Sequence, residues 1–578
     1  FGVSGAGAYV VINQVPFDSF SVALDARQIG ILALHYVLLS LPFFFSGAML
    51  GVLMTAFKER VGPLYAANMT GSAVGSVLAL LLPRWVGGEG VVWISGMLGG
   101  ITALGLAWLS GGRIRRWAVA GLGLLLFCGV VLVVEPSFAE LVLSPYKGLR
   151  YALQYPEAEI VHRAWNGFSR ITVVESPGIR SLPGLSFRFE GSLPPQDGLF
   201  IDGGRLSAVV RLPLSLLDDG GNNEALAFAD AMPTAIGYAL RPGGKSLVLE
   251  PQGGLEVWLA LASGAADAVA TVPNPLVLEA VGWLDEHGRV DAVASDARSF
   301  VERDTGRYDV VTLALTAPYQ PVRSGAYSLN EDYRYTVEAF RDYIGTLAPN
   351  GVFMVSRWLQ NPPSESLRAF ALAVTALEAE GLEPQSRIVA FRGYQVMTIL
   401  VKRHPFSEAE LDQIRTFADA RAFDLVLAPV LEPDSLNQYN VLPEPVYHRH
   451  FRALMESGDR DAWYEAYPFN VRPPTDNHPF FSHFFKWAQV PQILAELGKV
   501  WQPFGGAGYF ILLILLAISL ISAGGLILLP TAVLRRREAR AGSLQGSLSD
   551  LVYFGFLGLG YLFVEIPLIQ AGVLILGH

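Results

Sequence analysis

Long apolar runs occupy both ends of the chain, and a longer region of mixed polarity separates them. Six of these runs are long enough, or nearly so, to cross the roughly 30 Å hydrocarbon core of a bilayer as helices. They are residues 29–56, 63–82, 90–110, 117–134, 505–529 and 551–576. Residues 1–12 are expected to be the remnant of a truncated helix. The pattern predicts a multi-pass integral membrane protein with transmembrane helices in residues 1–135 and 505–578.

The mixed region predicts a soluble α/β domain. Residues 136–215 contain short β-type runs broken by Gly, Pro and Asp, which favours a small antiparallel β unit. Residues 216–403 alternate strands with helices, which is typical of a doubly wound sheet covered on both faces. Expected strands are 245–250, 268–272, 291–295, 308–315, 351–356, 386–390 and 396–402, and expected helices are 255–263, 275–284, 333–347 and 364–380. One of the last two strands should pair antiparallel. Residues 404–504 are expected to extend this domain.

Composition agrees with the membrane prediction and excludes several classes of function. The chain is 52% hydrophobic and only 16% charged, whereas soluble proteins have about 25% charged residues. The net charge is −10 and no large basic block is present, so nucleic acid is not expected as a partner. Cys128 is the one cysteine, which excludes intrachain disulfides and Cys-rich metal sites.

Basic residues follow three of the apolar runs. These residues are Lys58 and Arg60, then Arg113, Arg115 and Arg116, and finally Arg535, Arg536, Arg537 and Arg540. Loops rich in Lys and Arg tend to stay in the cytoplasm, and an even number of crossings separates these three loops. We therefore expect all three loops in the cytoplasm and the soluble domain on the extracytoplasmic side.

A series of short motifs runs through the soluble region. They are Ser144-Pro145-Tyr146-Lys147, Leu199-Phe200-Ile201-Asp202-Gly203, Gly253-Gly254-Leu255-Glu256, Ser295-Asp296-Ala297-Arg298, Tyr308-Asp309-Val310-Val311, Tyr327-Ser328-Leu329-Asn330-Glu331, Tyr335-Thr336-Val337-Glu338 and Pro473-Pro474-Thr475-Asp476-Asn477-His478-Pro479. With the membrane stretch Leu559-Gly560-Tyr561-Leu562-Phe563-Val564-Glu565, their order and spacing resemble the spermidine synthase superfamily, and more narrowly its bacterial membrane-fused branch.

The resemblance implies a Rossmann-like methyltransferase-type fold with a small N-terminal β unit, flanked by transmembrane helices. In active members this fold binds S-adenosylmethionine or decarboxylated S-adenosylmethionine. The family pattern places a glycine loop after the first strand, a ribose-binding acid after the second and an adenine-binding aspartate after the third. In true aminopropyltransferases, a pair of aspartates after the fourth strand binds and deprotonates the attacking amine.

The sequence departs from that pattern where the chemistry would occur. Glu250 and Gln252 stand where glycines are expected, and their side chains would crowd a cofactor. Pro273 stands in place of the ribose-binding acid and offers neither a carboxylate nor an N–H. Residues 313–318 contain no aspartate, so no general base for an amine is evident, and no catalytic residue is assigned.

Three residues of the pattern remain, and we interpret them as vestiges of a cofactor site. They are Gly253, Gly254 and Asp296. A tight strand-to-helix turn is the interpretation that we favour for the two glycines, and Asp296 could serve as a helix N-cap instead. No cofactor is therefore predicted, although S-adenosylmethionine or its decarboxylated form would be the cofactor of an active enzyme.

Two polar residues within the apolar runs could have either a functional or a packing role in the membrane. Glu565 lies in the last run and Asn68 in the second. Carboxylates within a membrane are costly and often functional, but both groups could instead hydrogen-bond other helices and fix their packing. His448, His450, His478 and His483 lack a nearby acid cluster and are interpreted as packing or solvent-exposed residues, with no metal site. The aromatic residues between Phe480 and Trp487 are expected to form an interfacial belt.

Three functional hypotheses follow. The leading one is a catalytically degenerate, spermidine synthase-like membrane protein that acts as a structural or partner-binding subunit of a membrane assembly, in contact with the bilayer and with protein partners. The first alternative is an active aminopropyl- or methyltransferase that uses an S-adenosyl cofactor. The second alternative is a transporter with a regulatory soluble domain, in which Glu565 carries a proton. The altered residues favour a protein that is not an enzyme.

Overall fold

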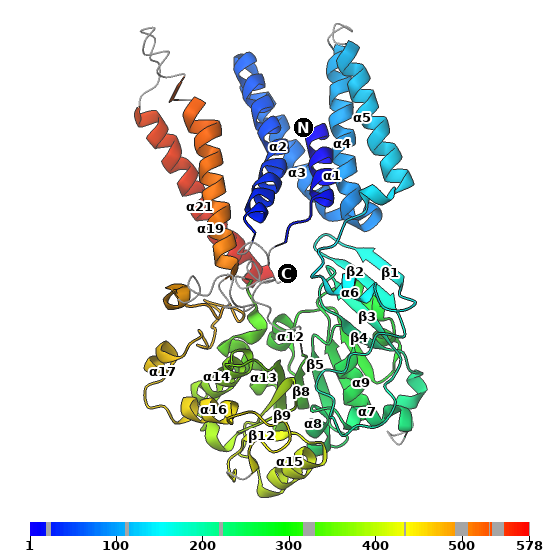
Figure 1. Ribbon diagram of the computed structural model, residues 1–578, viewed down its shortest axis with the longest axis vertical. Coiled ribbons are helices and arrows are strands. Elements are labelled where there is room, and N and C mark those ends of the chain that lie inside the picture. Colours follow the sequence, from blue (N-terminus) through cyan, green and yellow to red (C-terminus); the bar gives the residue numbers. More distant parts are fainter. Residues whose placement is uncertain are drawn as a thin grey trace.

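The computed structural model describes residues 1–18, 25–109, 115–218, 223–315, 330–432, 435–491, 507–530, 532–533 and 548–576 (Figure 1). Arg113, residues 535–540, the stretch after Leu315 and the Tyr327-Ser328-Leu329 motif lie outside the described residues. Long helices from both ends of the chain stand side by side, and the soluble domain lies at one end of them (Figure 1).

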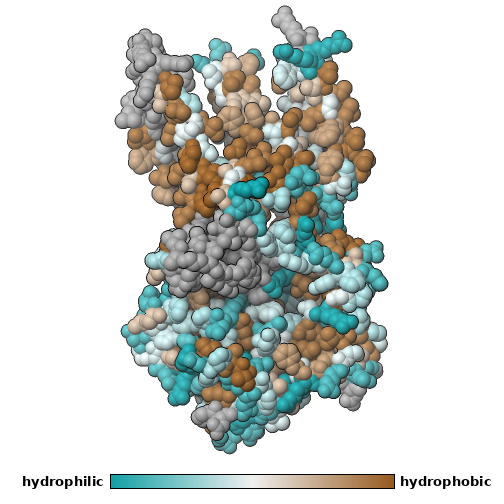
Figure 2. Space-filling model, in the orientation of Figure 1, coloured by the Kyte–Doolittle hydropathy of each residue, from teal (hydrophilic) through white to brown (hydrophobic). Residues whose placement is uncertain are grey.

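The apolar runs all form helices within the described residues. They are α1 (Gly2–Gln14), α2 (Arg27–Ala56), α3 (Val61–Leu81), α4 (Pro83–Leu109), α5 (Arg115–Val134), α19 (Ala507–Ala523) and α21 (Leu548–Leu576). Within the described ranges, four helices have the length and composition to cross a membrane, Arg27–Ala56, Lys58–Leu81, Pro83–Leu109 and Arg115–Val134. Apolar side chains cover the helical half of the molecule, whereas the soluble half is largely polar (Figure 2).

Small residues allow the N-terminal helices to pack closely. A Cβ atom on Gly96 of α4 would lie 2.7 Å from the Cys128 sulfur of α5, and one on Gly100 would lie 2.7 Å from the carbonyl oxygen of Gly121. Side chains at these glycines would therefore separate the two helices. Close backbone approach of this kind is typical of helix packing in membranes, where van der Waals contact replaces the hydrophobic effect.

The small antiparallel β unit is confirmed. Its strands are β1 (Glu159–Trp165), β2 (Arg170–Glu175), β3 (Gln196–Ile201) and β4 (Ser207–Val210), each paired antiparallel with the next along the chain. The short helix α6 (Gly148–Ala152) precedes it. Asp202 and Gly203 have φ angles of 51° and 62° and lie in the β3–β4 connection. Asp202 also accepts a hydrogen bond from the Arg170 N–H (2.8 Å), so this Asp-Gly pair forms a turn.

The soluble domain has the expected Rossmann-like α/β fold. Its described strands form one sheet in the order β12-β10-β11-β9-β8-β5-β6-β7. They are β5 (Lys245–Leu249), β6 (Asp267–Thr271), β7 (Val290–Val293), β8 (Tyr308–Leu313), β9 (Leu347–Trp358), β10 (Ile388–Arg392), β11 (Val396–Val401) and β12 (Asp424–Leu427). Strands β5 to β9 run parallel, and β11 is antiparallel to both β9 and β10, as the close spacing of the last two predicted strands suggested. β12 adds a strand that the sequence did not predict.

Helices cover both faces of the sheet, because the strands are apolar on both sides. In β5, Val248 packs into one hydrophobic core and Leu247 and Leu249 into the other; such alternation follows from the two-residue period of a strand. The helices are α7 (Ala227–Asp230), α8 (Ala235–Leu240), α9 (Leu255–Ala262), α10 (Pro275–Val281), α11 (Trp283–Glu286), α12 (Ala297–Arg303), α13 (Val337–Gly345), α14 (Glu365–Ala379), α15 (Glu408–Ala420), α16 (Val446–Glu456) and α17 (Arg460–Ala466).

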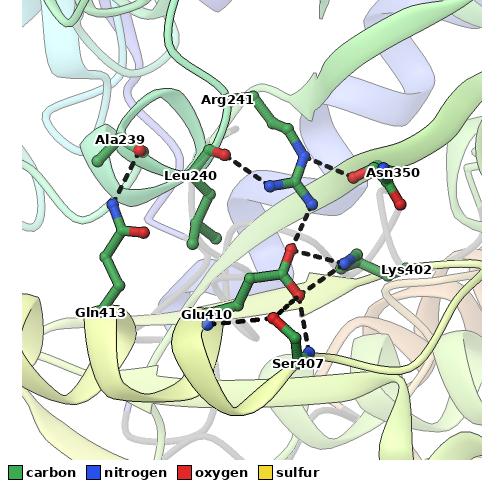
Figure 3. Close-up of polar contacts among 8 residues, drawn as sticks. All are labelled: Ala239, Leu240, Arg241, Asn350, Lys402, Ser407, Glu410 and Gln413. Carbon is green, nitrogen blue, oxygen red and sulfur yellow. Dashed lines mark hydrogen bonds and ion pairs between the residues drawn. The ribbon is translucent and has the colours of Figure 1, made fainter.

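A compact ion cluster fastens α15 to the sheet at the end of the domain farthest from the apolar helices (Figures 1 and 3). The Glu410 carboxylate accepts hydrogen bonds from Lys402 Nζ at 2.7 and 2.8 Å and pairs with Arg241. Glu410 also completes a capping box with Ser407 at the start of α15. One carboxylate thus joins the sheet, the segment after α8 and the first turn of α15.

Candidate functional site

The candidate site lies where the direction of the sheet reverses. From β5 the chain proceeds to β6 and β7 on one side, whereas β8 and β9 lie on the other. Rossmann-like sheets bind ligands outside the carboxyl ends of the strands at such a reversal. The loops that follow β5, β6 and β7 contain Gly253, Gly254, Pro273 and Asp296, so the fold brings the residues expected of the cofactor site to one edge.

The loop after β5 has a backbone conformation suited to glycine, although its residues differ. Glu250 and Gln252 have φ angles of 54° and 51°, and Gly254 has a φ of 85°. Non-glycine residues rarely adopt positive φ, because the Cβ atom then crowds the backbone. The path of a glycine-rich loop is therefore present, with two side chains that such a loop would lack.

The Glu250 side chain is engaged at the N-terminal end of α12. One carboxylate oxygen accepts a hydrogen bond from the Ala297 N–H (3.1 Å), and the other accepts one from Arg334 Nη1 (2.8 Å). Arg334 is in turn held by two hydrogen bonds to Asp332, at 2.7 and 2.8 Å. Glu250 is only 12% exposed. Its carboxylate thus lies beside the Asp296-Ala297 pair, the position that the resemblance assigns to an adenine ring.

Asp296 acts as the N-cap of α12. Its carboxylate accepts a hydrogen bond from the Ser299 N–H (2.8 Å), which satisfies a backbone donor that the helix itself leaves unpaired. The residue therefore lies at the expected position after the third parallel strand, and its observed contact is that of a helix cap.

Close packing accounts for both glycines of the loop. A Cβ atom on Gly253 would lie 2.4 Å from the carbonyl oxygen of Ala208 in β4, and the Gly253 N–H donates to Ser207 Oγ (3.1 Å). A Cβ atom on Gly254 would lie 2.6 Å from the Trp283 ring. The β unit thus lies directly against the loop, and the structure gives the glycines a packing role that needs no ligand.

The loop after β6 is bonded to the turn between β1 and β2. Asn274, which follows Pro273, accepts a hydrogen bond from Asn166 Nδ2 (3.0 Å) and donates one to Ser169 Oγ (2.7 Å). Asn274 is buried and caps α10. A side-chain network therefore occupies the edge of the sheet where the family pattern expects a ribose-binding acid.

A buried carboxyl group to which the sequence motifs assigned no role lies at the same edge. Glu256, in the first turn of α9, is 9% exposed. It is hydrogen-bonded to Thr234 Oγ1 (3.4 Å) and to the backbone of Leu315, just after β8. Burial raises its pKa from 4.5 to about 7, although these two hydrogen bonds lower it. The only available signal in the sequence was an acid inside an otherwise apolar helix.

The two polar residues expected within the membrane lie on different helices. Asn68 is in α3 and Glu565 in α21, and both are half-buried. Tyr561, one turn before Glu565 on the same helix, hydrogen-bonds to the Glu565 carboxylate. This contact lies within one helix, so it tests neither the packing nor the proton-carrying interpretation, and both stay predictions.

The predicted aromatic belt is wrong for most of its residues. Phe481, Phe484 and Phe485 are buried within the soluble domain, at 1–3% exposure, and only Trp487 is exposed. Arg368 explains this placement, since its buried guanidinium donates to the backbone carbonyls of Phe480, Phe481, Asn470 and His483 and lies over the Phe484 ring. The segment is thereby held against α14.

The histidines make separate contacts. His448 is hydrogen-bonded to the backbone carbonyl of Val426 (2.8 Å), and His450 packs edge-on against Tyr467. Burial, together with the charge of Arg368, lowers the pKa of His483 to about 4. In the part of the chain that the structure describes, no group of three or more His, Cys, Asp or Glu residues could hold a metal ion.

Comparisons with known proteins return structural likenesses only. No protein-family model and no curated protein matches the chain. Spermidine synthase from Thermotoga maritima is 14% identical, with a TM-score of 0.28, over 50% of this chain and 83% of that one. A probable spermidine synthase from Corynebacterium glutamicum is 15% identical, with a TM-score of 0.29, over 45% and 87%. Human methyltransferase-like protein 13, in complex with SAH, is 13% identical, with a TM-score of 0.24, over 33% and 88%.

Proposed function

We propose that this chain is a membrane protein whose spermidine synthase-like domain has lost aminopropyl transfer and serves as a structural or partner-binding subunit of a membrane assembly. The observation that carries the proposal is the placement of Glu250. Its carboxylate accepts a hydrogen bond from the Ala297 N–H and pairs with Arg334. The Glu250 side chain therefore occupies the edge where an S-adenosyl cofactor would be held.

Two further contacts, one in the same loop and one in the loop after β6, support the same conclusion. The Gly253 N–H is bonded to Ser207 of the β unit, and Asn274 is bonded to the β1–β2 turn. A cofactor at this edge would have to displace these contacts, and each buried polar group left without a partner costs about 1–3 kcal/mol.

Binding of S-adenosylmethionine and of its decarboxylated form to the full chain in nanodiscs tests this proposal. We expect calorimetry to detect no binding up to millimolar ligand from protein shown to be folded. Micromolar affinity that Asp296→Ala abolishes would refute the proposal and favour the transferase alternative.

We further propose that the soluble domain lies on the extracytoplasmic side. The turn between β1 and β2 contacts Leu80 near the end of α3, and Trp165 contacts Gly88 in α4. The α3–α4 joint is therefore on the side of the soluble domain, and the other ends of these helices are about 30 Å away. Lys58, Arg60, Arg115 and Arg116 lie at those far ends, where the positive-inside tendency would retain them in the cytoplasm.

Thiol labelling in membrane vesicles of known orientation tests this sidedness. Cys128 is buried in the helical bundle, so a Val430→Cys variant supplies an exposed thiol on the soluble domain. We expect a membrane-impermeant maleimide to label it in right-side-out vesicles and not in inverted ones. The opposite pattern would place the domain in the cytoplasm.

A further inference from the structure

The turn between β1 and β2 presents an apolar side chain at the membrane end of the soluble domain. Phe168 is 71% exposed. The turn that carries it is rigid, because Asn166 Oδ1 accepts hydrogen bonds from the N–H groups of Phe168 (3.1 Å) and Ser169 (2.8 Å). Asn274 bonds to the same turn from the sheet. An exposed aromatic ring on a turn fixed in this way points to a contact outside the chain.

The position of this turn relative to α3 indicates how Phe168 lies relative to the edge of the hydrocarbon core. A Cβ atom on Gly167 would lie 2.9 Å from the carbonyl oxygen of Leu80, so the backbone of the turn touches the last turn of α3. Helix α3 has 21 residues and a length of about 32 Å, close to the roughly 30 Å of the hydrocarbon core. Leu80 is therefore at the edge of that core, and Phe168 is at the same level.

Neighbouring residues have the composition of a membrane interface. Leu80, Leu81 and Trp85 are 63%, 49% and 69% exposed, and Arg84 is exposed between them. Tryptophan is enriched at the headgroup level, and an arginine there can extend its charge to the lipid phosphates.

Contacts on the inner side of the turn hold it against the helices. A Cβ atom on Gly88 would lie 2.8 Å from the Trp165 ring, so the ring packs directly against α4 at this glycine. Arg170 pairs with Glu89 (3.5 Å), and the arginine side chain is only 6% exposed. The outward side of the turn, which carries Phe168, is thus set in a fixed orientation.

We propose that Phe168 inserts into the headgroup–acyl boundary of the bilayer that α3 and α4 cross, beside Trp85 and Arg84. The soluble domain would then contact lipid directly through the β1–β2 turn, in addition to its covalent links to the helices. This inference rests on the membrane placement in the proposed function and is independent of the loss of transferase activity.

Spin-label accessibility in nanodiscs tests the proposal. Three single-cysteine variants, Phe168→Cys, Leu39→Cys in α2 and Val430→Cys beside α15, are made in a Cys128→Ala background. If that background does not fold, Cys128 is retained, since it is buried and the three new positions are exposed. Collision rates with oxygen, which partitions into lipid, are compared with those of an aqueous nickel chelate.

We expect the oxygen-to-nickel ratio at position 168 to exceed that at position 430 severalfold and to approach that at position 39. A ratio at 168 equal to that at 430 would place Phe168 in water and overturn the proposal. Protection of 168 from both reagents would indicate a protein contact and would also overturn it. A water-like ratio at position 39 would instead refute the membrane placement itself.

Discussion

The Glu410 ion cluster offers a quantitative test of how α15 is held to the sheet. In Glu410→Gln the charge is removed, but an amide oxygen can still accept the Ser407 N–H bond of the capping box, since glutamine serves at this position as glutamate does. The variant therefore isolates the interaction with Lys402 and Arg241. Lys402 is 3% exposed and Arg241 14%, so the two cations would be left close together and largely shielded from water (Figure 3).

The shift in pKa gives the magnitude. Burial alone would raise the pKa of Glu410, but hydrogen bonds from Lys402, Arg241 and the Ser407 N–H together outweigh it and lower the pKa from 4.5 to about 2. At about 1.4 kcal/mol per pKa unit, the ionised form gains roughly 3 kcal/mol on folding. Because the variant keeps the Ser407 bond, this value is the upper limit for the two cations. Removing one member of a buried ion pair typically costs 3–5 kcal/mol, which agrees. The contribution is complete above pH 4.5 and is lost as the pH falls from 4.5 toward 2.

Hydrogen exchange of α15 in the full chain measures this effect locally. At neutral pH, 3 kcal/mol corresponds to roughly 100-fold faster exchange, provided that α15 opens without global unfolding. Glu408→Gln is the matched control, since Glu408 lies in the same first turn and is exposed. If both variants exchange within twofold of each other, the cluster does not hold the helix and the reasoning is refuted.

Three other substitutions have expected outcomes. Because burial raises the pKa of Glu256 from 4.5 to about 7, the folded state should lose stability as the pH rises from 4.5 to 7, and Glu256→Gln should raise the free energy of unfolding at pH 8 by up to about 3 kcal/mol in urea titrations. Gly253→Ala, with its Cβ 2.4 Å from the β4 backbone, should destabilise the domain by about 1–3 kcal/mol in the same titrations. Gly88→Leu, which would collide with Trp165, should speed hydrogen exchange in β1, whereas Gly105→Leu in the same helix, with open space around it, should not.

Most of the fold could be predicted because its signals are local. The short apolar run of β5 and the long apolar runs at both ends of the chain identify these elements without tertiary information. β12 was missed because it is a short edge strand, and its first residue, Asp424, is charged. The buried Asp424 carboxylate pairs with Arg392 (3.3 Å) and accepts hydrogen bonds from the N–H groups of Tyr439 and Asn440 (2.8 Å each), contacts that the sequence does not reveal. The expected helix 275–284 is broken at Gly282, which has a φ of 53°.

The site could be predicted only in part. The family resemblance placed Glu250 where a glycine is expected, and the positive φ of this residue is one that glycine adopts readily. Its partner Arg334 is 84 residues away, and Asn166 is 108 residues from Asn274. Such contacts depend on how the β unit and the sheet are packed together, so no local sequence pattern predicts them.

The loop after β6 connects the edge of the sheet to the apolar helices through the β1–β2 turn. Asn274 joins the loop after β6 to the β1–β2 turn, and that turn contacts α3 through Gly167. A ligand that displaced Asn274 would break two side-chain hydrogen bonds, each worth about 1 kcal/mol, and would free the turn that orients the domain on the helices. A domain that serves as a scaffold gains from an edge closed in this way, whereas a transferase needs the same edge open. Under the proposed scaffold function, the Asn274 contacts would keep this joint rigid, and the Glu250 contacts would close the neighbouring loop against α12.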